Sequence, residues 1–567
     1  MNRRVNVLKT EVLVIGAGGA GLRAALAAFD AGADVRVVVN GKLGRTGATA
    51  YPVADYAGFQ ASDGCNPDDT PQRHFGDIMD AALGACDPNL ARIAAEESPL
   101  ALRELQEWGV EFVLEAHGKH QIGKACFSSA ARSHRILGHG EPIVRALGNE
   151  LQKRNIPVDE NAMVTDLIVR DGECVGASVI NNRNELVIYE AKAVVLATGG
   201  AGRLFRMNLN PVDINGSSYA LALDAGAELV NMEFMQTGLA FKKPLGLLGA
   251  WVWEYGPQLF NSDGEHFLGN YLPAGITVDD CYADKSKHYP FSSRDNSKFV
   301  ESSISQEIRK GNKVFMDLRS IKDREAFCKR PLYPWLKKKG LDLMEKEAEI
   351  AVYAHAINGG VRIDENGQST VPGLFAAGEA AGGPHGADRL GGGMLSVSQV
   401  FGRRAGIGAA QRAQRRLSPC LKANDYKELI SQLEQTPVAG TVPVEEVRVR
   451  LKSTMFDNLV IDRNGAGMEQ ARREVFALQD IVQNNLDMNN VDIRDLVTLR
   501  HLFSVAEIII GAASLRKESR GGHYRADFPD RDSNFNGVVH ISRKNGFEFR
   551  AAEDVPVGRS FSALKGG

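Results

Sequence analysis

Short apolar runs that end in glycine alternate with helical stretches along the first part of the chain. Residues 11–15 are rich in β-branched side chains, and the turn Gly16-Ala-Gly-Gly-Ala-Gly21 follows at once. Residues 22–29 are rich in alanine and leucine, which favours a helix. A second apolar run covers 34–39, and a third, 193–197, again ends in glycines. This order of strand, glycine turn and helix predicts an α/β fold with a parallel sheet.

The glycine turn at residues 16–21 has the pattern of a dinucleotide-binding loop. Gly16 permits the tight turn, Gly18 lets the backbone approach a pyrophosphate, and Gly21 lets the helix pack closely on the strand. The free N–H groups at the start of that helix attract an anion. The second apolar run ends in Asn40, where such sites usually have a ribose-binding acid. Asn can still bond a ribose hydroxyl, so these residues alone leave the nucleotide open.

Composition and charge narrow the class of protein. A chain of 567 residues needs more than one hydrophobic core, and 44% apolar with 24% charged residues is typical of globular proteins. The net charge of -3 gives no reason to expect a nucleic-acid partner. Residues 1–10 run directly into the first strand, which argues against a signal peptide. We find no run of about eighteen uncharged apolar residues and expect no membrane span.

The cysteines do not form a recognisable metal or disulfide pattern. They number seven and contain no C-x-x-C pair, so we expect no zinc, iron-sulfur or other metal site. Most of them should be small buried apolar residues, and a reducing cytoplasm suits them best. The seven are Cys65, Cys86, Cys126, Cys174, Cys281, Cys328 and Cys420.

The most specific motifs lie between residues 373 and 406. Gly373-Leu-Phe-Ala-Ala-Gly-Glu379 precedes His385-Gly-Ala-Asp-Arg389-Leu-Gly-Gly-Gly-Met-Leu395, and Val400-Phe-Gly-Arg403 follows. Further motifs are Ser293-Arg-Asp295, His355 to Gly360, and the charged stretch 516–530, which we interpret as a structural ion-pair network. This order resembles the superfamily of fumarate reductase and succinate dehydrogenase flavoprotein subunits, L-aspartate oxidase and the adenylylsulfate reductase alpha subunit. The resemblance covers nearly the whole chain and implies an FAD-dependent oxidoreductase acting on CH-CH groups.

The resemblance also implies which side chains act on the substrate. In this family hydride passes between flavin N5 and one carbon of an activated double bond, and a proton is exchanged at the next carbon. Arg389 and His355 would bind a substrate carboxylate, for which the planar guanidinium fork is suited. Arg294 would shuttle the proton, which requires crowding by other positive groups because the pKa of arginine lies above about 12. We expect these three side chains to converge over one face of the flavin.

The expected flavin site combines the glycine turns with positions that the resemblance supplies. Glu379 would bind the ribityl chain, and the backbone at Met394 and Leu395 would face the flavin ring. The full expected set of cofactor-binding residues is Gly16, Gly18, Gly19, Ala20, Gly21, Asn40, Gly41, Lys42, Thr46, Gly47, Ala48, Thr49, Met163, Ala197, Thr198, Gly199, Glu379, Arg389, Met394 and Leu395.

One departure from the family pattern concerns the attachment of the flavin. Family members that bind flavin covalently use a histidine in an R-S-H-T motif, and this chain has Gly47 at that place. We therefore predict non-covalent FAD, with a lowered potential that in this family favours reduction of the substrate, or use as an oxidase, over succinate oxidation. His134 and His139 lie where the family has a histidine-containing loop near the flavin, but surface positions would suit them equally.

A second departure concerns the substrate side. Residues 232–238 lack three positions and a substrate-binding histidine of the family pattern, and an acidic segment is replaced by Gly249 to Gly256. Trp251, Trp253 and Tyr255 alternate at strand spacing, so they either line a rebuilt pocket or form one face of a β-strand. The substrate is expected to be larger or less charged than fumarate.

The expected architecture is α/β, with a Rossmann-like FAD-binding domain, an inserted α+β capping domain and a C-terminal helical domain. The FAD-binding domain should comprise residues 1–238 and 350–415, because both flavin-contacting regions must meet on one sheet. The cap would span 239–349, carry Arg294 and exclude water from the hydride step. After residue 416 the apolar spacing becomes helical up to a tail that ends at 567.

Three functions remain open on the sequence alone. The first is reduction or desaturation of a carboxylated C-C bond, with a small carboxylate as substrate and electrons exchanged with an iron-sulfur subunit, in a chain that is cytoplasmic or bound to a membrane through its partner. The second is an amino-acid oxidase like L-aspartate oxidase. The third is an electron-transfer subunit whose substrate pocket has eroded. Adenylylsulfate-reductase-like chemistry would require a nucleotide pocket that the sequence does not reveal, and an oligomer is possible in each case.

Overall fold

A seven-stranded sheet organises the first domain in the computed structural model, which describes residues 6–416, 421–434, 439–489 and 491–552. The strand order is β6-β2-β1-β9-β8-β7, and β17 pairs with the end of β9. The strands are β1 (Asn6–Ile15), β2 (Val35–Val38), β6 (Val158–Asp159), β7 (Met163–Arg170), β8 (Glu173–Ile180), β9 (Leu186–Leu196) and β17 (Leu374–Ala376).

The parallel part of this sheet brings four strand ends together. Ile15 of β1 lies opposite Val38 of β2 and Leu196 of β9, and Ala376 of β17 pairs with Leu196 from the other side. The loops that follow these strands therefore leave from one edge of the sheet. Ligands of open α/β sheets bind at this carboxyl edge.

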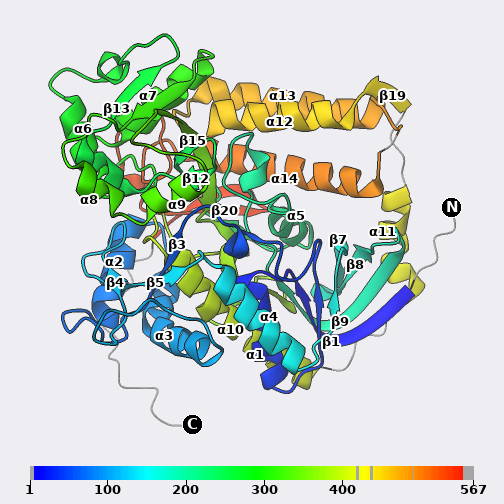
Figure 1. Cartoon of the computed structure of the whole chain (residues 1–567). Helices are drawn as coiled ribbons and strands as arrows, with labels where there is room; N and C mark the ends of the chain where they lie inside the picture. Colours follow the sequence, from blue (N-terminus) through cyan, green and yellow to red (C-terminus); the bar gives the residue numbers. More distant parts are fainter. Residues whose placement is uncertain (1–5, 417–420, 435–438, 490, 553–567) are drawn as a thin grey trace.

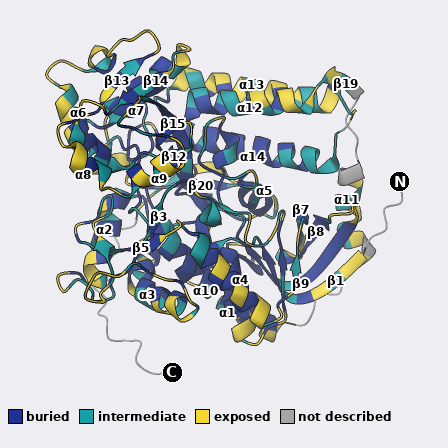
Figure 2. Ribbon diagram, viewed as in Figure 1, coloured by how far each residue is buried: buried dark blue, intermediate teal, exposed yellow. Residues whose placement is uncertain are grey.

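Helices cover the sheet, and α1 (Gly19–Asp30) packs against both α4 (Glu141–Lys153) and α10 (Gly393–Arg415) (Figure 1). The strand β9 and the second half of β1 are buried, whereas one face of α13 (Gly465–Asn484), a helix of the C-terminal part, is exposed (Figure 2). The other elements of this domain are α2 (Pro71–Ala82), α3 (Pro88–Glu107), α5 (Ser217–Asp224) and a small sheet of β3 (Tyr56–Gln60), β5 (Ser133–Leu137) and β4 (Ile122–Gly123).

The inserted cap has its own five-stranded sheet in the order β12-β11-β15-β14-β13. Its strands are β11 (Met235–Phe241), β12 (Gly246–Leu247), β13 (Gln258–Asn261), β14 (Val314–Asp317) and β15 (Ala348–Ile357), and its helices are α6 (Val278–Lys285), α7 (Lys298–Arg309), α8 (Arg324–Cys328) and α9 (Leu332–Lys338). The sheet extends beyond the predicted cap of 239–349 at both ends, because β11 pairs over its whole length with residues 350–357 of β15.

The strand alternative for the aromatic segment of the cap is wrong. Residues Ala250–Tyr255 form a short 3-10 helix, so the alternating aromatic rings do not share one face of a sheet. Trp253 is buried, with its ring centroid 5.1 Å from that of Tyr282, whereas Trp251 is half-buried. Short 3-10 helices also occur at Ala48–Ala50, Gly202–Leu204, Leu268–Tyr271, Gly378–Ala380 and Ser533–Phe535.

The C-terminal part is helical, as predicted, but it also returns to the first domain. Its helices are α11 (Ala423–Glu434), α12 (Val444–Leu459), α13 (Gly465–Asn484) and α14 (Ile493–Leu515), with a short strand β19 (Ala439–Val442). A final hairpin then joins a sheet of order β18-β16-β10-β20-β21. That sheet comprises β10 (Leu229–Val230), β16 (Gly360–Arg362), β18 (Ala381–Gly382), β20 (Gly537–Ser542) and β21 (Gly546–Ala551).

The helix α14 is long and apolar enough to cross a membrane by length and composition alone, with a mean hydropathy of 1.6 in its most apolar window. However, 67% of that window is buried inside the protein, where α14 contacts α5, α13 and β20. A core helix of a large domain has the same composition. We therefore interpret α14 as the core helix of the C-terminal part.

Candidate active site

One cavity of about 680 Å³ opens at the carboxyl edge of the large sheet. Its walls include the loops that follow β1, β2, β9 and β17, and the cap and the start of α10 complete it. A volume of this size is typical of sites that enclose a sizeable organic ligand. The N-termini of α1 and α10 both contribute lining residues, so their free N–H groups favour an anionic group in the cavity.

The glycine turn after β1 has the geometry that a dinucleotide requires. Gly16 has φ of +109°, and a Cβ atom there would lie 2.3 Å from the carbonyl oxygen of Ala197. A Cβ atom at Gly21 would lie 2.0 Å from the carbonyl oxygen of Gly16, so only glycine allows α1 to pack this closely. By contrast, a Cβ atom at Gly18 would meet nothing within 4 Å, because this face of the turn is open to the cavity. The turn thus forms a cradle for a pyrophosphate.

Most of the predicted cofactor residues line this cavity, but three of them do not. Gly21 lies behind the wall, in the contact between α1 and β1. Gly41 and Lys42 are also absent from the wall, because Gly41 packs against Thr46 and the Lys42 side chain is exposed to solvent. The predicted residues that line the cavity are Gly16, Gly18, Gly19, Ala20, Asn40, Thr46, Gly47, Ala48, Thr49, Met163, Ala197, Thr198, Gly199, Glu379, Arg389, Met394 and Leu395.

Glu379 presents a buried carboxyl group to the cavity. Its Oε1 accepts a hydrogen bond of 2.9 Å from the backbone N–H of Ile357. Burial raises the pKa of Glu379 to about 7, which this hydrogen bond and the charge of Arg389 only partly offset. A polyhydroxylated ligand would supply the hydrogen-bond donors that the carboxylate lacks, which fits the ribityl chain of FAD.

Arg389 brings a positive charge without a salt-bridge partner among the described residues to the cavity wall. The residue is 8% exposed, and its Nη2 donates a hydrogen bond of 2.8 Å to Oε1 of Gln236. Its Nε has no hydrogen-bond partner, and no carboxylate of the described residues forms a salt bridge with it. Burial lowers the pKa of Arg389 to about 10, so the guanidinium remains charged at neutral pH. A buried charge of this kind requires an anion.

His355 and Tyr289 place further unsatisfied polar atoms beside this arginine. Nδ1 of His355 and the hydroxyl oxygen of Tyr289 are buried and lack a hydrogen-bond partner, and the two rings meet edge to face at 6.0 Å. Burial and the charge of Arg389 lower the pKa of His355 to about 3, so the imidazole is neutral and can donate only one N–H. Both residues line the cavity, His355 from β15 and Tyr289 from the loop after α6.

Arg294, the third side chain that the sequence predicted at this place, is not among the residues that line the cavity. Its Nε and Nη2 donate hydrogen bonds of 3.0 and 2.7 Å to Oδ2 of Asp388, and its guanidinium lies 4.4 Å from the ring centre of Phe127. Asp388 is buried, which raises its pKa although Arg294 opposes the shift. Asp388 directly precedes Arg389, which lines the cavity, and Arg294 is paired with Asp388. Arg294 therefore lies one layer behind the cavity wall.

The cap contributes both aromatic and charged side chains to the rim of the cavity. Trp251, Glu254 and Arg330 line the cavity there, with the Arg330 guanidinium 5.1 Å from the Trp251 ring centre and its Nη2 3.6 Å from Oε2 of Glu254. Lys287 adds an exposed ammonium group to the same wall. The segment that differs from the family pattern therefore does line the cavity, but Trp251 is the only one of its three aromatic residues that takes part.

Comparisons with known proteins agree with this geometry. Residues 11–395 match the family model of the FAD binding domain, and residues 448–554 match that of the fumarate reductase flavoprotein C-term. The chain is 32% identical to one of the subunits of the CoM/CoB fumarate reductase of Methanothermobacter marburgensis, over 94% of this chain and 97% of that protein. The chain belongs to the fumarate reductase and succinate dehydrogenase family of FAD-dependent flavoproteins.

Two further comparisons show similarity to other members of the family. It is 29% identical to the L-aspartate oxidase of Bacillus subtilis, over 98% of both chains. Its fold matches the structure of Mycobacterium smegmatis Sdh1 in complex with UQ1 with a TM-score of 0.84 at 29% identity, covering 98% of this chain and 96% of that one. It is an FAD-dependent oxidoreductase of the fumarate reductase and succinate dehydrogenase type that acts on CH-CH groups.

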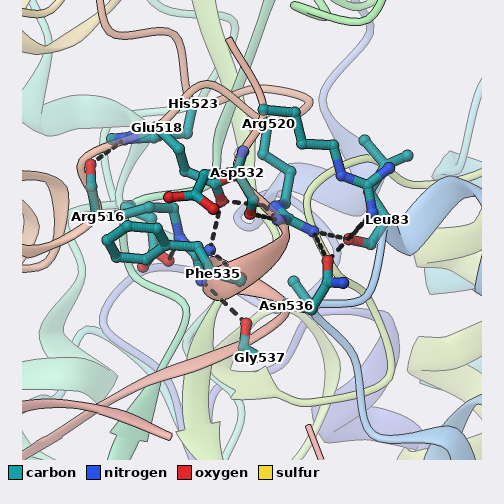
Figure 3. A network of polar contacts seen from close by, with 12 residues as sticks. Leu83, Arg516, Glu518, Arg520, His523, Asp532, Phe535, Asn536 and Gly537 are labelled. Carbon is teal, nitrogen blue, oxygen red and sulfur yellow. Dashed lines mark hydrogen bonds and ion pairs between the residues drawn. The ribbon is translucent and has the colours of Figure 1, made fainter. Parts of the chain in front are cut away.

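The charged stretch near the C-terminus of the flavoprotein forms a buried ion-pair network (Figure 3). Oε1 of Glu518 accepts hydrogen bonds of 2.8 Å from Arg516 and 2.6 Å from Arg520, and all three side chains are fully buried. In the turn that follows, the N–H of Gly522 donates a hydrogen bond to the carbonyl oxygen of Ala387, two residues before Arg389. The network thus positions the arginine segment, in agreement with its interpretation as structural.

The two histidines of the predicted flavin loop have different surroundings. His139 lines the cavity, whereas His134 is fully buried on β5 and does not line it. Neither has the surface position that was the alternative. Six of the seven cysteines lie in the described residues, and all six are free thiols, of which Cys126 lines the cavity; Cys420 lies outside the described part.

Sequence reasoning did not identify Tyr289 or Gln236 as site residues. Gln236 lies in the segment that differs from the family pattern, so its contact with Arg389 could have been suspected from that difference alone. Tyr289 carries no motif, and only the packing of the cap over the first domain brings its hydroxyl to the cavity.

Replacing Tyr289 with phenylalanine is expected to lower kcat/KM about tenfold, because one hydrogen bond to the substrate contributes about 1–2 kcal/mol. The flavin content should not change, since the ring stays in place. Steady-state turnover and the absorbance of bound flavin test this. Tyr282, which packs in the cap against Trp253, provides the matched Tyr282→Phe control, expected to retain normal turnover. Equal rates for the Tyr289→Phe and wild-type proteins would remove Tyr289 from the site.

Proposed function

We propose that this flavoprotein transfers hydride between a non-covalently bound FAD and a carboxylated C-C double bond, and that a separate iron-sulfur subunit exchanges electrons with the flavin. The observation that carries the proposal is the charge of Arg389, which is buried in the cavity wall without a carboxylate partner among the described residues. His355 and Tyr289 add donors with no other partner beside it. This arrangement suits an anion with a carbonyl-type oxygen.

The residues of the flavoprotein have separable tasks in this reaction. Arg389 binds the carboxylate and stabilises the negative charge that develops on it, because it is already oriented before the substrate arrives. Gln236 orients the guanidinium, and the neutral His355 donates one hydrogen bond. FAD, when bound, supplies or accepts the hydride, and the cradle at Gly18 together with Glu379 would hold it.

The proton for the neighbouring carbon is assigned to Arg294, as the resemblance implies. Asp388 supports this assignment, because a buried carboxyl with a raised pKa can carry a proton to the guanidinium that it contacts. Arg294 lies one layer behind the wall, so its guanidinium has to turn from Asp388 toward the cavity when the substrate binds.

The rim of the cavity indicates the class of substrate. One buried arginine suits a single carboxylate, while Trp251 gives the other end an aromatic surface. The positive charges of Lys287 and Arg330 lie at the exposed rim, where solvent screens them. We therefore propose an enoate with one tightly bound carboxylate and a larger remainder than that of fumarate.

The FAD of this protein is expected to dissociate completely when the protein is denatured with acid. Gly47 lines the cavity where a tethering histidine would be needed, and glycine has no side chain to form the bond. Precipitation with acid, followed by the absorbance of pellet and supernatant, measures this. A yellow pellet would show a covalent link at another residue, of which His139 would be the first to examine.

An iron-sulfur partner is proposed because two relatives are named as subunits of larger enzymes. One belongs to the CoM/CoB fumarate reductase of Methanothermobacter marburgensis, and the other is the fumarate reductase flavoprotein subunit of Haemophilus influenzae. The described cysteines of this chain offer no four-thiolate set for a cluster, so electrons would have to arrive from elsewhere. We propose a cytoplasmic location, with attachment to a membrane only through such a partner.

Anaerobic titration of the reduced flavoprotein distinguishes the candidate functions. The flavin is reduced with dithionite, and a panel of enoates, saturated dicarboxylates and amino acids is added while flavin absorbance is recorded. Reoxidation by an enoate is expected. Bleaching of the oxidised form by L-aspartate, with hydrogen peroxide formed in air, would instead indicate an oxidase. Reoxidation by a one-electron acceptor and by none of the organic substrates would indicate an eroded site.

A further inference from the structure

Four side chains with metal-binding atoms meet beside the small three-stranded sheet. They are Asp63, Cys65, His120 and His134, and their ligand atoms all lie within 4.8 Å of one another. Oδ2 of Asp63 lies 3.1 Å from Sγ of Cys65, 3.4 Å from Nδ1 of His120 and 3.1 Å from Nε2 of His134. Sγ of Cys65 lies 3.6 Å from Nδ1 of His120. The group does not line the flavin cavity.

These spacings fit a tetrahedral ion. Zinc bonds of about 2.0 Å to nitrogen and oxygen and about 2.3 Å to sulfur place neighbouring ligand atoms roughly 3.3–3.6 Å apart. The four separations of 3.1, 3.1, 3.4 and 3.6 Å lie close to that range before any ion draws the atoms together. One sulfur, two imidazole nitrogens and one carboxylate oxygen also form the donor set that zinc prefers over calcium or magnesium.

The second ring nitrogen of each histidine has its own partner. Nδ1 of His134 lies 3.0 Å from the carbonyl oxygen of Arg132, which accepts its proton and leaves Nε2 free to bind a metal. Nε2 of His120 lies 2.8 Å from the side-chain amide of Gln106, whose oxygen accepts that proton after a half-turn of the amide. Metal-binding histidines almost always have an acceptor of this kind behind them, because it fixes the tautomer and the ring.

The charges also balance. A thiolate and a carboxylate carry two negative charges, and two neutral imidazoles add none, so a divalent cation makes the site neutral. The site is partly enclosed, since His134 is fully buried and the other three residues are half-buried. A neutral site can be enclosed in this way without the desolvation cost of a net charge.

We propose that Asp63, Cys65, His120 and His134 bind one zinc ion in a closed structural site. Four protein ligands leave no position for a substrate, which is typical of structural zinc. The ion would join the loop after β3 to the segment just before β4 and to the strand β5. Gln121, beside His120, and Ser133 and Arg135, on either side of His134, line the flavin cavity. Zinc therefore stabilises one wall of the flavin cavity from outside the cavity.

The metal content of the full-length flavoprotein tests this proposal. Protein produced with added zinc chloride and dialysed against buffer should contain one zinc per chain by plasma mass spectrometry. Zinc X-ray absorption should show one sulfur at about 2.3 Å and three lighter atoms at about 2.0 Å. Zinc chloride added to metal-stripped protein should raise the Tm, because an ion that binds only the folded chain stabilises it.

Matched variants separate the site from adventitious binding. Cys65→Ala and His120→Ala should each lose at least nine-tenths of the zinc and the zinc-dependent rise in Tm, and both positions are only half-buried, so the fold should persist. His117→Ala changes an exposed histidine three residues from His120, and Cys328→Ser changes a half-buried cysteine in the cap. Both controls should keep one zinc per chain.

Three results would overturn the proposal. The first is wild-type protein that contains less than a tenth of an equivalent of metal and takes up none from zinc chloride. The second is His120→Ala or Cys65→Ala protein with the same zinc content as His117→Ala. The third is bound zinc whose absorption spectrum lacks a sulfur neighbour. None of these results depends on turnover, so they leave the proposed oxidoreductase function to its own test.

Discussion

Replacement of Arg389 with glutamine is expected to lower kcat/KM about 10³-fold while the protein keeps its FAD. Removing a preorganised donor to developing charge costs about 10²–10³-fold in rate, and truncating one partner of a buried charge pair costs about 2–5 kcal/mol. Arg389 combines both tasks, because it is the charge opposite the substrate and is fixed by Gln236. Arg389→Lys should recover only part of the rate, since an ammonium group cannot bind a carboxylate through two parallel bonds.

Stopped-flow reoxidation of the dithionite-reduced variant by the best enoate measures this effect on the chemical step. Flavin content and the Tm, recorded in parallel, separate a lost contact from a damaged fold. The control is Arg403→Gln, which alters an arginine on the same helix as the cavity wall but outside the cavity, near Glu104. Turnover of Arg389→Gln within a few-fold of the wild type would show that no carboxylate binds at Arg389, and the proposed substrate class would then be wrong.

Local rules account for the parts of the flavin site that the sequence predicted. The positive φ of Gly16 is a local requirement, and Gly21 is required by the carbonyl oxygen of Gly16 about one helical turn away, so both leave a readable spacing in the sequence. The same holds for the strand ends at Ile15, Val38 and Leu196, whose apolar runs end where the loops begin. Regular periodicity and fixed turn chemistry are therefore sufficient for the parallel sheet and its nucleotide edge.

The parts that the sequence did not predict depend on contacts between distant segments. Tyr289 enters the cavity only because the cap lies over the first domain, and the four proposed zinc ligands come from three separate segments, at residues 63 to 65, at 120 and at 134. Alternation of Trp251 and Tyr255 suggested a strand, but the two residues lie on a 3-10 helix, where their rings contact each other and the ring of Phe327. In that segment, tertiary packing of the side chains decided the local structure, and the alternation of aromatic residues did not.

The position of Arg294 shows the same limit at the centre of the mechanism. The motif Ser293-Arg-Asp295 predicted an arginine in the cap. It did not predict that Asp388 would hold the guanidinium of Arg294 away from the cavity. A neutral amide at position 388 could not form the ion pair that this carboxylate forms, so the resting partner of Arg294 depends on this one side chain.

Substituting Arg294 with alanine is expected to lower turnover about 10³-fold and to leave the yellow colour of bound FAD unchanged. A general acid contributes about 10²–10⁴-fold to a rate, and Arg294 is the proposed proton donor. The same change leaves Asp388 buried without its cation, which should cost about 3 kcal/mol of stability. The rate of enoate reduction and the urea dependence of unfolding measure the two effects separately.

The double variant Arg294→Gln with Asp388→Asn separates the proton from the ion pair. Asparagine removes the buried charge, so the double variant should recover most of the stability that Arg294→Ala loses. Its turnover should stay as low as that of Arg294→Ala, because no proton donor has been restored. Recovery of turnover together with stability would mean that Arg294 only neutralises Asp388 and positions Arg389. The proton would then have to come from a group already in the cavity wall, and the candidate is the unpartnered hydroxyl of Tyr289, whose ring meets that of His355 edge to face.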